Sequence, residues 1–295
     1  MKYKKRDEFL VLSIDEKHQN ISILDLFQQF HLSKKTIHLL KQNKAYYLNE
    51  QFVPVTTILH LNDQLSIKAY DLGIDYLPQY YNLQIIYEDD ILCIVNKPAA
   101  TIIHPENKQG KNTLCNYVAY YYKHTQQNYP VRFLHRLDKD TTGLVMFCKC
   151  SLLQPCFDTM ISEKRIKKTY LAWIKGHMNQ KNLTINQPIG NDRHHQQKMI
   201  ISRSGKYAMT HIQQLKVKKD YSLVECQIET GRKHQIRVHL NSINHPIIGD
   251  ELYGNKSSYI NRMALHAYRL QFIHPLTNKK MDIICDIPDD MKKMF

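Results

Sequence analysis

The densest group of chemically capable side chains is the stretch HRLDKDTTG at residues 135–143. In it Asp138 lies two residues after Arg136, and a carboxylate beside a cation stays ionised even when it is partly buried. An ionised carboxylate can act as a nucleophile, whereas the same pair on a surface only closes a turn. These nine residues alone favour the structural ion pair, so the role of Asp138 depends on what the chain places around it.

The residues before this stretch predict how Asp138 is presented. If VRFLHRLD (131–138) is extended, side chains alternate between two faces. Val131, Phe133, His135 and Leu137 then point toward the core, and the other face carries Arg132, Leu134, Arg136 and Asp138. The following DTTG predicts a turn, in which Gly143 is free to adopt a positive φ before an apolar run. Asp138 is therefore expected at a strand end, where rigid scaffolds often carry catalytic groups.

A second polar cluster is ETGRKHQIRVHL at residues 229–240. Thr230-Gly231 interrupts a strand, and the residues after it fit a helix on which His234 and Arg237 are three apart and share a face. A cation held there would either pair with a buried carboxylate or grip a phosphate. An amphipathic helix with a solvated basic face explains the pattern equally well.

Composition limits the class of partner. The net charge of +14 favours a polyanion, and nucleic acid is favoured over membrane because no basic amphipathic helix stands out. A merely basic globular protein is the alternative. The seven cysteines form no C-x-x-C pair, which is typical of reduced thiols, and no run is long enough for a signal peptide or a membrane span. We therefore expect a cytoplasmic protein, and a monomer without an obligate protein partner, because no oligomerisation motif is present.

Metal and nucleotide sites lack their usual sequence signatures. Despite 16 histidines there is no H-E-x-x-H, and the closest approaches to a ligand set are Asp138-x-Asp140 and the pair His194-His195. No GxxxxGK[ST], GxGxxG or G-x-S-x-G stretch occurs. The sequence predicts neither a metal nor a cofactor.

The chain divides into two parts by composition. Residues 1–72 predict a small unit of two helices (23–30 and 33–44) followed by short β-prone pieces. The second helix, with Ser33 as its N-cap, is expected to expose four basic residues: Lys34, Lys35, Lys41 and Lys44. They are candidates for RNA binding, and a solvated basic face explains them equally well.

Residues 73–84 contain Gly73 and Pro78 without periodicity and predict a linker. From residue 85 to residue 295 many strands mix with few helices, with no regular βαβ alternation. The fold class expected is α+β, with a mixed, largely antiparallel sheet.

Six stretches in order resemble the RluA-type RNA pseudouridine synthases. HRLDKDTTGL is similar to that family's nucleophile motif HRLDxxTSGLL, and the stretch before it resembles the family's opening hairpin, YEDxxLLVVNKPAGLxVHP. The other four follow in register to about residue 290. The six are IIYEDDILCIVNKPAATIIHP (85–105), HRLDKDTTGL (135–144), KKTYLAWIKG (167–176), GRKHQIRVHL (231–240), HPIIGDELYG (245–254) and LHAYRLQFIHP (265–275). The first 72 residues are more loosely similar to an S4 domain, a small RNA-binding module.

The resemblance implies a pseudouridine synthase fold and a role for each matching residue. Asp138 matches the nucleophilic aspartate, which attacks the target uridine at the sugar C1′ or at the base. Tyr170 matches the tyrosine that stacks on the uracil and serves as a base in the last proton removal. Arg237 matches the cation paired with the nucleophile, and Arg136 matches an arginine implicated in opening the RNA.

The implied reaction agrees with the absence of cofactor signatures. Isomerisation of uridine to pseudouridine replaces an N-glycosidic by a C-glycosidic bond without redox change, so neither metal nor nucleotide cofactor is required. The target base must leave its stack, which costs a few kcal/mol, and the positive charge attracts the RNA backbone. The expected partner is structured RNA, ribosomal before transfer RNA, with Arg232 and His234 as further candidate RNA contacts.

Two departures from the family pattern are Thr142 in place of serine and Ala100 in place of glycine. The hydroxyl survives at the first, and the second removes an easy positive φ from its turn. Two rival functions stay open at this point: an RNA-binding protein that no longer catalyses, and a metal-dependent nuclease that uses Asp138, Asp140 and nearby histidines.

Overall fold

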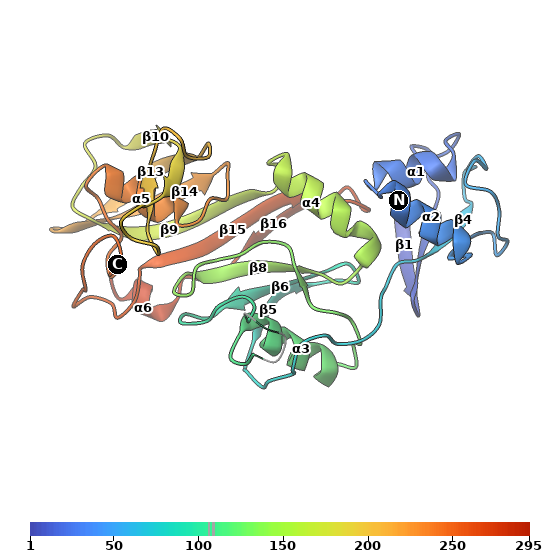
Figure 1. Ribbon diagram of the computed structural model, residues 1–295, viewed down its shortest axis with the longest axis horizontal. Helices are drawn as coiled ribbons and strands as arrows, with labels where there is room; N and C mark the ends of the chain where they lie inside the picture. Colours follow the sequence, from blue (N-terminus) through green and yellow to red (C-terminus); the bar gives the residue numbers. More distant parts are fainter. Residues whose placement is uncertain (106, 108–109) are drawn as a thin grey trace.

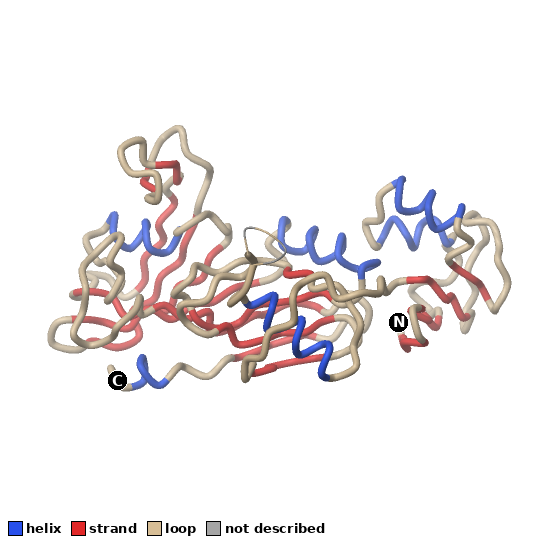
Figure 2. Tube along the Cα trace, turned by 60° about the horizontal axis from the view of Figure 1, so that its bottom comes forward, coloured by secondary structure: helices blue, strands red, loops and turns tan. Residues whose placement is uncertain are grey.

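The computed structural model describes residues 1–105, 107 and 110–295. The chain forms a four-stranded sheet and a ten-stranded sheet, joined by residues 69–83, which contain no helix or strand. Figure 1 shows the small sheet and its two helices at one end of an elongated molecule, with the large sheet filling the remainder. In Figure 2 the strands of the large sheet cross the middle of the molecule, and the helices lie at its periphery.

The N-terminal sheet has the strand order β1-β2-β4-β3 and is antiparallel throughout. Both helices predicted here are present, and the Oγ of Ser33 accepts a hydrogen bond from the Thr36 amide (3.0 Å) as expected of an N-cap. The hairpin of β1 and β2 was missed, because its first strand is so rich in lysine that it resembles a flexible basic opening. The elements are β1 (Lys2–Arg6), β2 (Phe9–Ser13), α1 (Ile23–Gln29), α2 (Lys34–Gln42), β3 (Tyr46–Leu48) and β4 (Gln64–Lys68).

The large sheet has the order β10-β13-β14-β9-β15-β8-β6-β5, with β16 on β15 and β7 on β8. Every pair in it is antiparallel except β15 with β8, so the predicted mixed, largely antiparallel α+β fold is confirmed. Its strands are β5 (Gln84–Glu88), β6 (Leu92–Lys97), β7 (Arg132–Phe133), β8 (Thr142–Cys148), β9 (Lys167–Lys175), β10 (Asn182–Asn186), β13 (Met209–Val217), β14 (Tyr221–Ile228), β15 (Leu265–Ile273) and β16 (Lys280–Ile284).

Short helices and one small hairpin complete the fold. Helix α3 is capped by Thr113 and coincides with the helical period of NTLCNYVAYYYKH (112–124), whereas no local pattern indicated α4 or the β11–β12 hairpin. These elements are α3 (Leu114–His124), a 3₁₀ turn (Ser151–Leu153), α4 (Gln154–Ser162), β11 (Ile189–Asn191), β12 (Met199–Ile201), α5 (Gln235–Ser242) and α6 (Asp289–Lys292). All seven cysteines are free and buried, as the spacing predicted. Among the described residues, no helix is long and apolar enough to span a membrane.

The segment that leads to Asp138 is extended for a shorter distance than the sequence predicts. Strand β7 ends at Phe133, and the residues from 134 to 141 form bends and a turn before β8 begins. The predicted alternation is therefore wrong at Leu134, which is buried rather than on the polar face. It is right at His135, whose Nε2 accepts a hydrogen bond from the Met146 amide in the interior.

Candidate active site

Asp138 lies in a loop that buried groups hold against the sheet. Its backbone carbonyl accepts from the Thr141 amide (3.1 Å), which closes the predicted turn. Lys97, at the end of β6 and fully buried, donates from Nζ to the carbonyls of Thr101 (2.7 Å) and Lys139 (2.8 Å). The lysine thus ties the loop after β6 to the residue after Asp138, which fixes the position of Asp138.

The turn after Asp138 enters β8 through Gly143, as predicted. This residue has φ +110°, and a Cβ built on it would lie 2.3 Å from the Ala267 carbonyl oxygen on β15. A side chain is excluded both by the backbone conformation and by the close parallel approach of β8 to β15. Gly143 therefore lets the strand that follows the loop pack directly against its neighbour.

Arg237 on α5 pairs with Asp138, as the resemblance implied. Its Nη1 donates to Asp138 Oδ2 at 3.0 Å, while its Nε and Nη2 donate to the two oxygens of Asp250 at 2.7 and 2.8 Å. The Asp138 side chain is 28% exposed, whereas that of Asp250 is completely buried. Asp250 therefore sets the plane of the guanidinium, and the remaining nitrogen of the fork reaches the more accessible carboxylate.

Electrostatics keep Arg237 charged in this setting. Burial by itself lowers the pKa of Arg237, but the carboxylates of Asp250 and Asp138 raise it above its usual range. Within the described part of the chain, the ion pair that closes on Asp138 thus comes from Arg237 and not from Arg136, which is exposed. Arg237 thus places a permanent positive charge 3.0 Å from the carboxylate oxygen of the candidate nucleophile.

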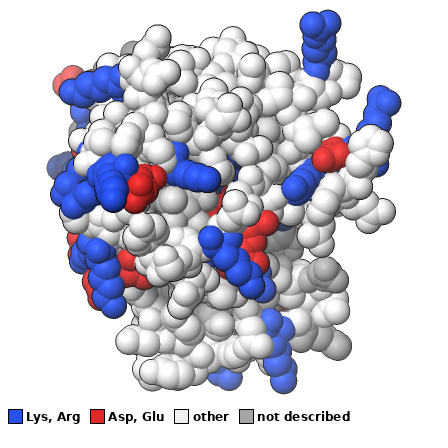
Figure 3. Space-filling model, turned by 90° about the vertical axis from the view of Figure 1, so that its left-hand side faces the viewer, with Lys and Arg blue, Asp and Glu red and all other residues white. Residues whose placement is uncertain are grey.

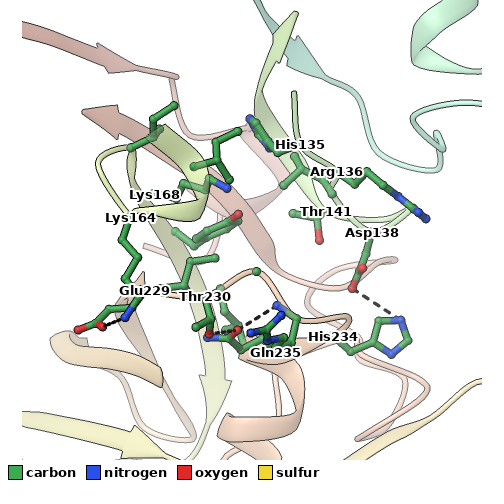
Figure 4. Close-up of a pocket in the computed structure, with 18 of the residues that line it drawn as sticks. His135, Arg136, Asp138, Thr141, Lys164, Lys168, Glu229, Thr230, His234 and Gln235 are labelled. Carbon is green, nitrogen blue, oxygen red and sulfur yellow. Dashed lines mark hydrogen bonds and ion pairs between the residues drawn. The ribbon is translucent and has the colours of Figure 1, made fainter. Parts of the chain in front are cut away.

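Tyr170 and Asp138 line one cavity of about 690 Å³. Tyr170 lies on β9, between Cys226 of β14 and Ala267 of β15, and is 6% exposed. Burial raises its pKa, and the charge of Asp138 raises it further, so the hydroxyl stays protonated at neutral pH. Figure 4 shows this cavity, with Lys168 and Thr230 near its wall and Asp138 at one side.

A second cavity of about 960 Å³ is also lined by Asp138. Arg136, Arg232 and His234 line both cavities as well, so the two cavities meet at the loop around Asp138. The structure therefore brings six of the predicted site residues to these two cavities: Arg136, Asp138, Tyr170, Arg232, His234 and Arg237. Lys34, Lys35 and Lys41 on α2 and Lys44, two residues beyond its end (together the α2 lysines), are not among them. They line neither cavity, and α2 lies at the opposite end of the molecule in Figure 1.

His234 departs from its predicted placement on the face of a helix. Helix α5 begins at Gln235, and His234 is the residue that caps it, with a left-handed φ of +55°. Its Nε2 nevertheless lies 4.0 Å from Asp138 Oδ2, so the histidine reaches the site from the turn rather than from the helix.

The comparisons with known proteins now bear on this geometry. A family model described as RNA pseudouridylate synthase matches residues 91–242, which span Asp138, Tyr170 and Arg237. The chain is 38% identical over 265 residues to the uncharacterized RNA pseudouridine synthase YhcT of Bacillus subtilis, covering 89% of this chain and 88% of that protein. The chain belongs to the RNA pseudouridine synthase family. It is thus an enzyme whose reaction is the isomerisation of uridine to pseudouridine in RNA.

Further relatives agree with this assignment. The ribosomal large subunit pseudouridine synthase D of Zymomonas mobilis is 36% identical over 233 residues, covering 74% of this chain and 73% of that protein. The solved structure of human RNA pseudouridylate synthase domain containing 1 aligns with a TM-score of 0.59 at 26% identity, over 70% of this chain and 83% of that chain. A model of the RluD ribosomal pseudouridine synthase N-terminal domain matches residues 10–65.

The structure adds site residues of this pseudouridine synthase that sequence reasoning missed. Asp250 stands inside the stretch HPIIGDELYG, but nothing in its spacing indicated a bond to Arg237. Gln235, which is buried, accepts from Thr230 Oγ1 (2.7 Å) and the Arg232 amide and so braces the turn before α5. A buried glutamine within a basic run was the available signal, because such a side chain must be hydrogen-bonded.

Proposed function

We propose that this enzyme isomerises specific uridines in ribosomal RNA with Asp138 as its nucleophile. The observation that carries the proposal is the chain of bonds from Asp250 through Arg237 to Asp138 at the edge of a cavity that also contains Tyr170. In this arrangement the nucleophile is charged, accessible and oriented before substrate binds, which is the condition for preorganised catalysis.

The target uridine enters the cavity between Asp138 and Tyr170. Tyr170 forms an apolar wall for the uracil ring, and its protonated hydroxyl is available as a hydrogen-bond donor in the resting enzyme. One oxygen of Asp138 is engaged by Arg237, so the other oxygen attacks the uridine, either at C1′ or at the base. Tyr170 can act as the base in the last step only as a phenolate. Because its hydroxyl is protonated in the resting enzyme, another group must first remove the hydroxyl proton once the uracil is bound.

Ribosomal RNA is the proposed substrate, with transfer RNA as the second candidate. The support is the name of the Zymomonas mobilis relative, which acts on the ribosomal large subunit, and the match of the first unit to a ribosomal synthase domain. The net charge of +14 supplies attraction to the backbone of either RNA. Figure 3 shows basic side chains outnumbering acidic ones on the end of the molecule opposite the N-terminal unit.

We further propose a division of labour along the chain. Residues 1–72 are an S4-like RNA-binding unit that uses the α2 lysines, residues 73–84 are the linker, and residues 85–295 are the catalytic unit. Arg136 and Arg232 contact the RNA near the target, and Arg136 opens the structure around it. The enzyme acts as a cytoplasmic monomer without an obligate protein partner.

Release of tritium from C5 of uridine-labelled transcripts tests the proposal. Wild-type enzyme is expected to release tritium from large-subunit ribosomal RNA and far less from transfer RNA. Asp138→Asn is expected to lower the rate by a factor of about 10³ or more because it removes the nucleophile. Asp140→Asn, the same change two residues along the turn, is the matched control and is expected to retain most of the rate.

Each alternative predicts a different result in this assay. An inactive RNA-binding relative would bind RNA and release no tritium with any cellular RNA. Tritium release that Asp138→Asn leaves unchanged would contradict the role given to Asp138. A metal-dependent nuclease that uses Asp138 and Asp140 as ligands would cut the RNA in the wild-type reaction, would be impaired by Asp140→Asn as well as by Asp138→Asn, and would stop in chelator. The length of the transcript reveals the cutting.

A further inference from the structure

Tyr253 connects the β11–β12 hairpin to His234. Its hydroxyl oxygen accepts a hydrogen bond from the Met199 amide at the start of β12 (2.7 Å) and lies 3.0 Å from His234 Nδ1. The Met199 amide only donates, and within the described residues the hydroxyl has no hydrogen-bond partner besides Met199 and His234, so its proton is assigned to the bond with the histidine. In this assignment His234 Nδ1 is the acceptor.

This hydrogen bond selects one tautomer of His234. A neutral imidazole carries a single proton, and because Nδ1 accepts, the proton must be on Nε2. Burial lowers the pKa of His234, which favours the neutral ring. Nε2 is the nitrogen that lies 4.0 Å from Asp138 Oδ2, and Figure 4 shows the ring of His234 facing Asp138 along this line.

The backbone at His234 is held in a conformation that the residue does not prefer. Its φ of +55° is left-handed, which costs a residue with a Cβ about 1 kcal/mol or more. The turn stays in place because Gln235 bonds Thr230 and the Arg232 amide on one side and donates to the Met209 carbonyl on the other. Strain of this kind, overridden by its surroundings, is concentrated at functional sites.

We propose that His234 is a positioning residue for the nucleophile, with its tautomer set by Tyr253. Its Nε2–H points at the same oxygen of Asp138, Oδ2, that Arg237 already engages. The two donors together direct Oδ1 toward the uridine. A separation of 4.0 Å is longer than a hydrogen bond, and such catalytic contacts tighten when substrate binds.

Arg237 and Tyr253 reinforce the same arrangement. The Arg237 guanidinium carbon lies 5.0 Å from the centre of the Tyr253 ring, so the ring packs against the cation while its hydroxyl orients the histidine. The inference rests on the proposed role of Asp138 and gives His234 a different task from binding RNA phosphate. Phosphate binding would affect substrate affinity, whereas positioning affects the chemical step.

Steady-state kinetics on a ribosomal RNA transcript separate these two tasks. His234→Ala is expected to lower kcat between about 10- and 100-fold, the effect of losing a hydrogen bond to a charged group, with KM changed less than about threefold. His234→Gln keeps an N–H near the position of Nε2 and is expected to retain kcat within about fivefold. Tyr253→Phe keeps the ring under Arg237 and is expected to lower kcat about fivefold, because both tautomers become accessible.

Nitrogen-15 NMR of histidine-labelled enzyme reads the tautomer without any turnover. The ring signals that disappear in His234→Gln identify His234, and the Nε2–H pattern is expected in wild type and a mixture in Tyr253→Phe. Exposed His177→Ala is the control for loss of a histidine, and thermal melting shows which variants fold.

Two results would overturn the inference. One is a raised KM with unchanged kcat in a folded His234→Ala, which would make His234 a phosphate contact. The other is an Nδ1–H or a doubly protonated ring in wild type at neutral pH. Failure of the proposed function itself shows differently, as absence of pseudouridine in the wild-type reaction.

Discussion

The molecule uses its cations in two opposite ways. Lys97 and Arg237, which hold Asp138 in place, are buried and hydrogen-bonded: Lys97 donates to carbonyl oxygens and is fully buried, and the side chain of Arg237 is 11% exposed between two carboxylates. The four α2 lysines, three on the helix and Lys44 just after it, are exposed, and within the described residues none lies at ion-pair distance from a carboxylate. The first group is held in one geometry, and the second is free to follow a flexible polyanion.

The energetic consequences of the two arrangements differ accordingly. Removing either the cation or the carboxylate of a buried ion pair leaves the other charge uncompensated and lowers the free energy of unfolding by about 3–5 kcal/mol. An exposed lysine contributes little to stability, and its attraction to phosphate is screened by salt. Substitutions at the active site should therefore affect both stability and chemistry, while substitutions on α2 should affect only RNA affinity and its salt dependence.

The largest expected effect is that of Arg237→Met. It removes the cation from Asp138 and also leaves Asp250 as a buried carboxylate without its bidentate partner. We expect the rate of pseudouridine formation to fall by a factor of about 10³ and the free energy of unfolding to fall by about 3–5 kcal/mol. Tritium release and urea unfolding measure the two losses.

A double variant separates stability from catalysis at this site. Asp250→Asn added to Arg237→Met removes the buried charge, while the amide oxygen still accepts from the Leu252 amide. The double variant should regain most of the stability and none of the activity. Recovery of activity along with stability would mean that Arg237 acts only by maintaining the fold.

His266 provides a smaller test of the buried framework beside the nucleophile loop. Its Nε2 donates to the Cys285 carbonyl, so its Nδ1 accepts from the Thr142 hydroxyl at 2.9 Å, which joins β8 to β15. Burial lowers the pKa of His266 to about 4. Because the folded value lies below the unfolded value, stability is complete above about pH 6.5 and is lost as pH falls toward 4.

The expected loss from His266 across that range is at most about 3 kcal/mol. His266→Gln cannot titrate, so its unfolding free energy should fall less steeply between pH 6.5 and 4 than that of wild type. Urea unfolding of the two proteins at several pH values gives the difference. Equal slopes would show that His266 is already protonated in the folded enzyme or exchanges no proton on unfolding.

Substitution of the exposed lysines should give an effect of about 1–2 kcal/mol in RNA binding. Replacing all four α2 lysines by glutamine should weaken binding about 10- to 30-fold near physiological salt, with kcat and unfolding free energy unchanged. The dependence of log affinity on log salt should become shallower, since fewer counterions are released. The control replaces four lysines at the other end of the molecule: Lys216, Lys219, Lys292 and Lys293. Equal losses in both variants would mean that α2 is not a specific contact surface.

Sequence reasoning predicted those parts of the structure that local patterns encode. Continuous apolar runs such as 144–148 mark buried strands, and Ser33 marks the start of α2, because burial and capping act within a few residues. The pairing of Arg237 with Asp138 joins residues 99 apart, and it came only from the family resemblance. Polarity and spacing alone had offered Arg136 as the partner.

The features that were missed depend on long-range packing. Asp250 became part of the site because the loop after α5 passes under Arg237, and the residues between the two, 238–249, carry no periodic signal of that approach. Lys97 lies in the stretch that resembles the family's opening hairpin, and nothing in that stretch indicated that its ammonium group is enclosed by carbonyls of two loops. Burial lowers its pKa to about 7, an outcome that no local pattern predicts.

Ala100 gives the smallest expected effect and tests how far the active-site framework is strained. The sequence suggested that alanine excludes a positive φ at this turn, but Ala100 adopts φ +54°. The bond from the Thr101 amide to the Lys139 carbonyl and the three carbonyl bonds of Lys97 hold the turn in this conformation.

Ala100→Gly relieves the left-handed strain, which stabilises the folded state. Glycine also gives the unfolded chain more conformational freedom, which offsets part of this gain, so the net stabilisation should be about 0.5–1 kcal/mol. Urea unfolding measures it, and Ala99→Gly, at the neighbouring residue without positive φ, should instead destabilise. A loss of stability in Ala100→Gly would show that the methyl group contributes more through packing than the backbone loses through strain.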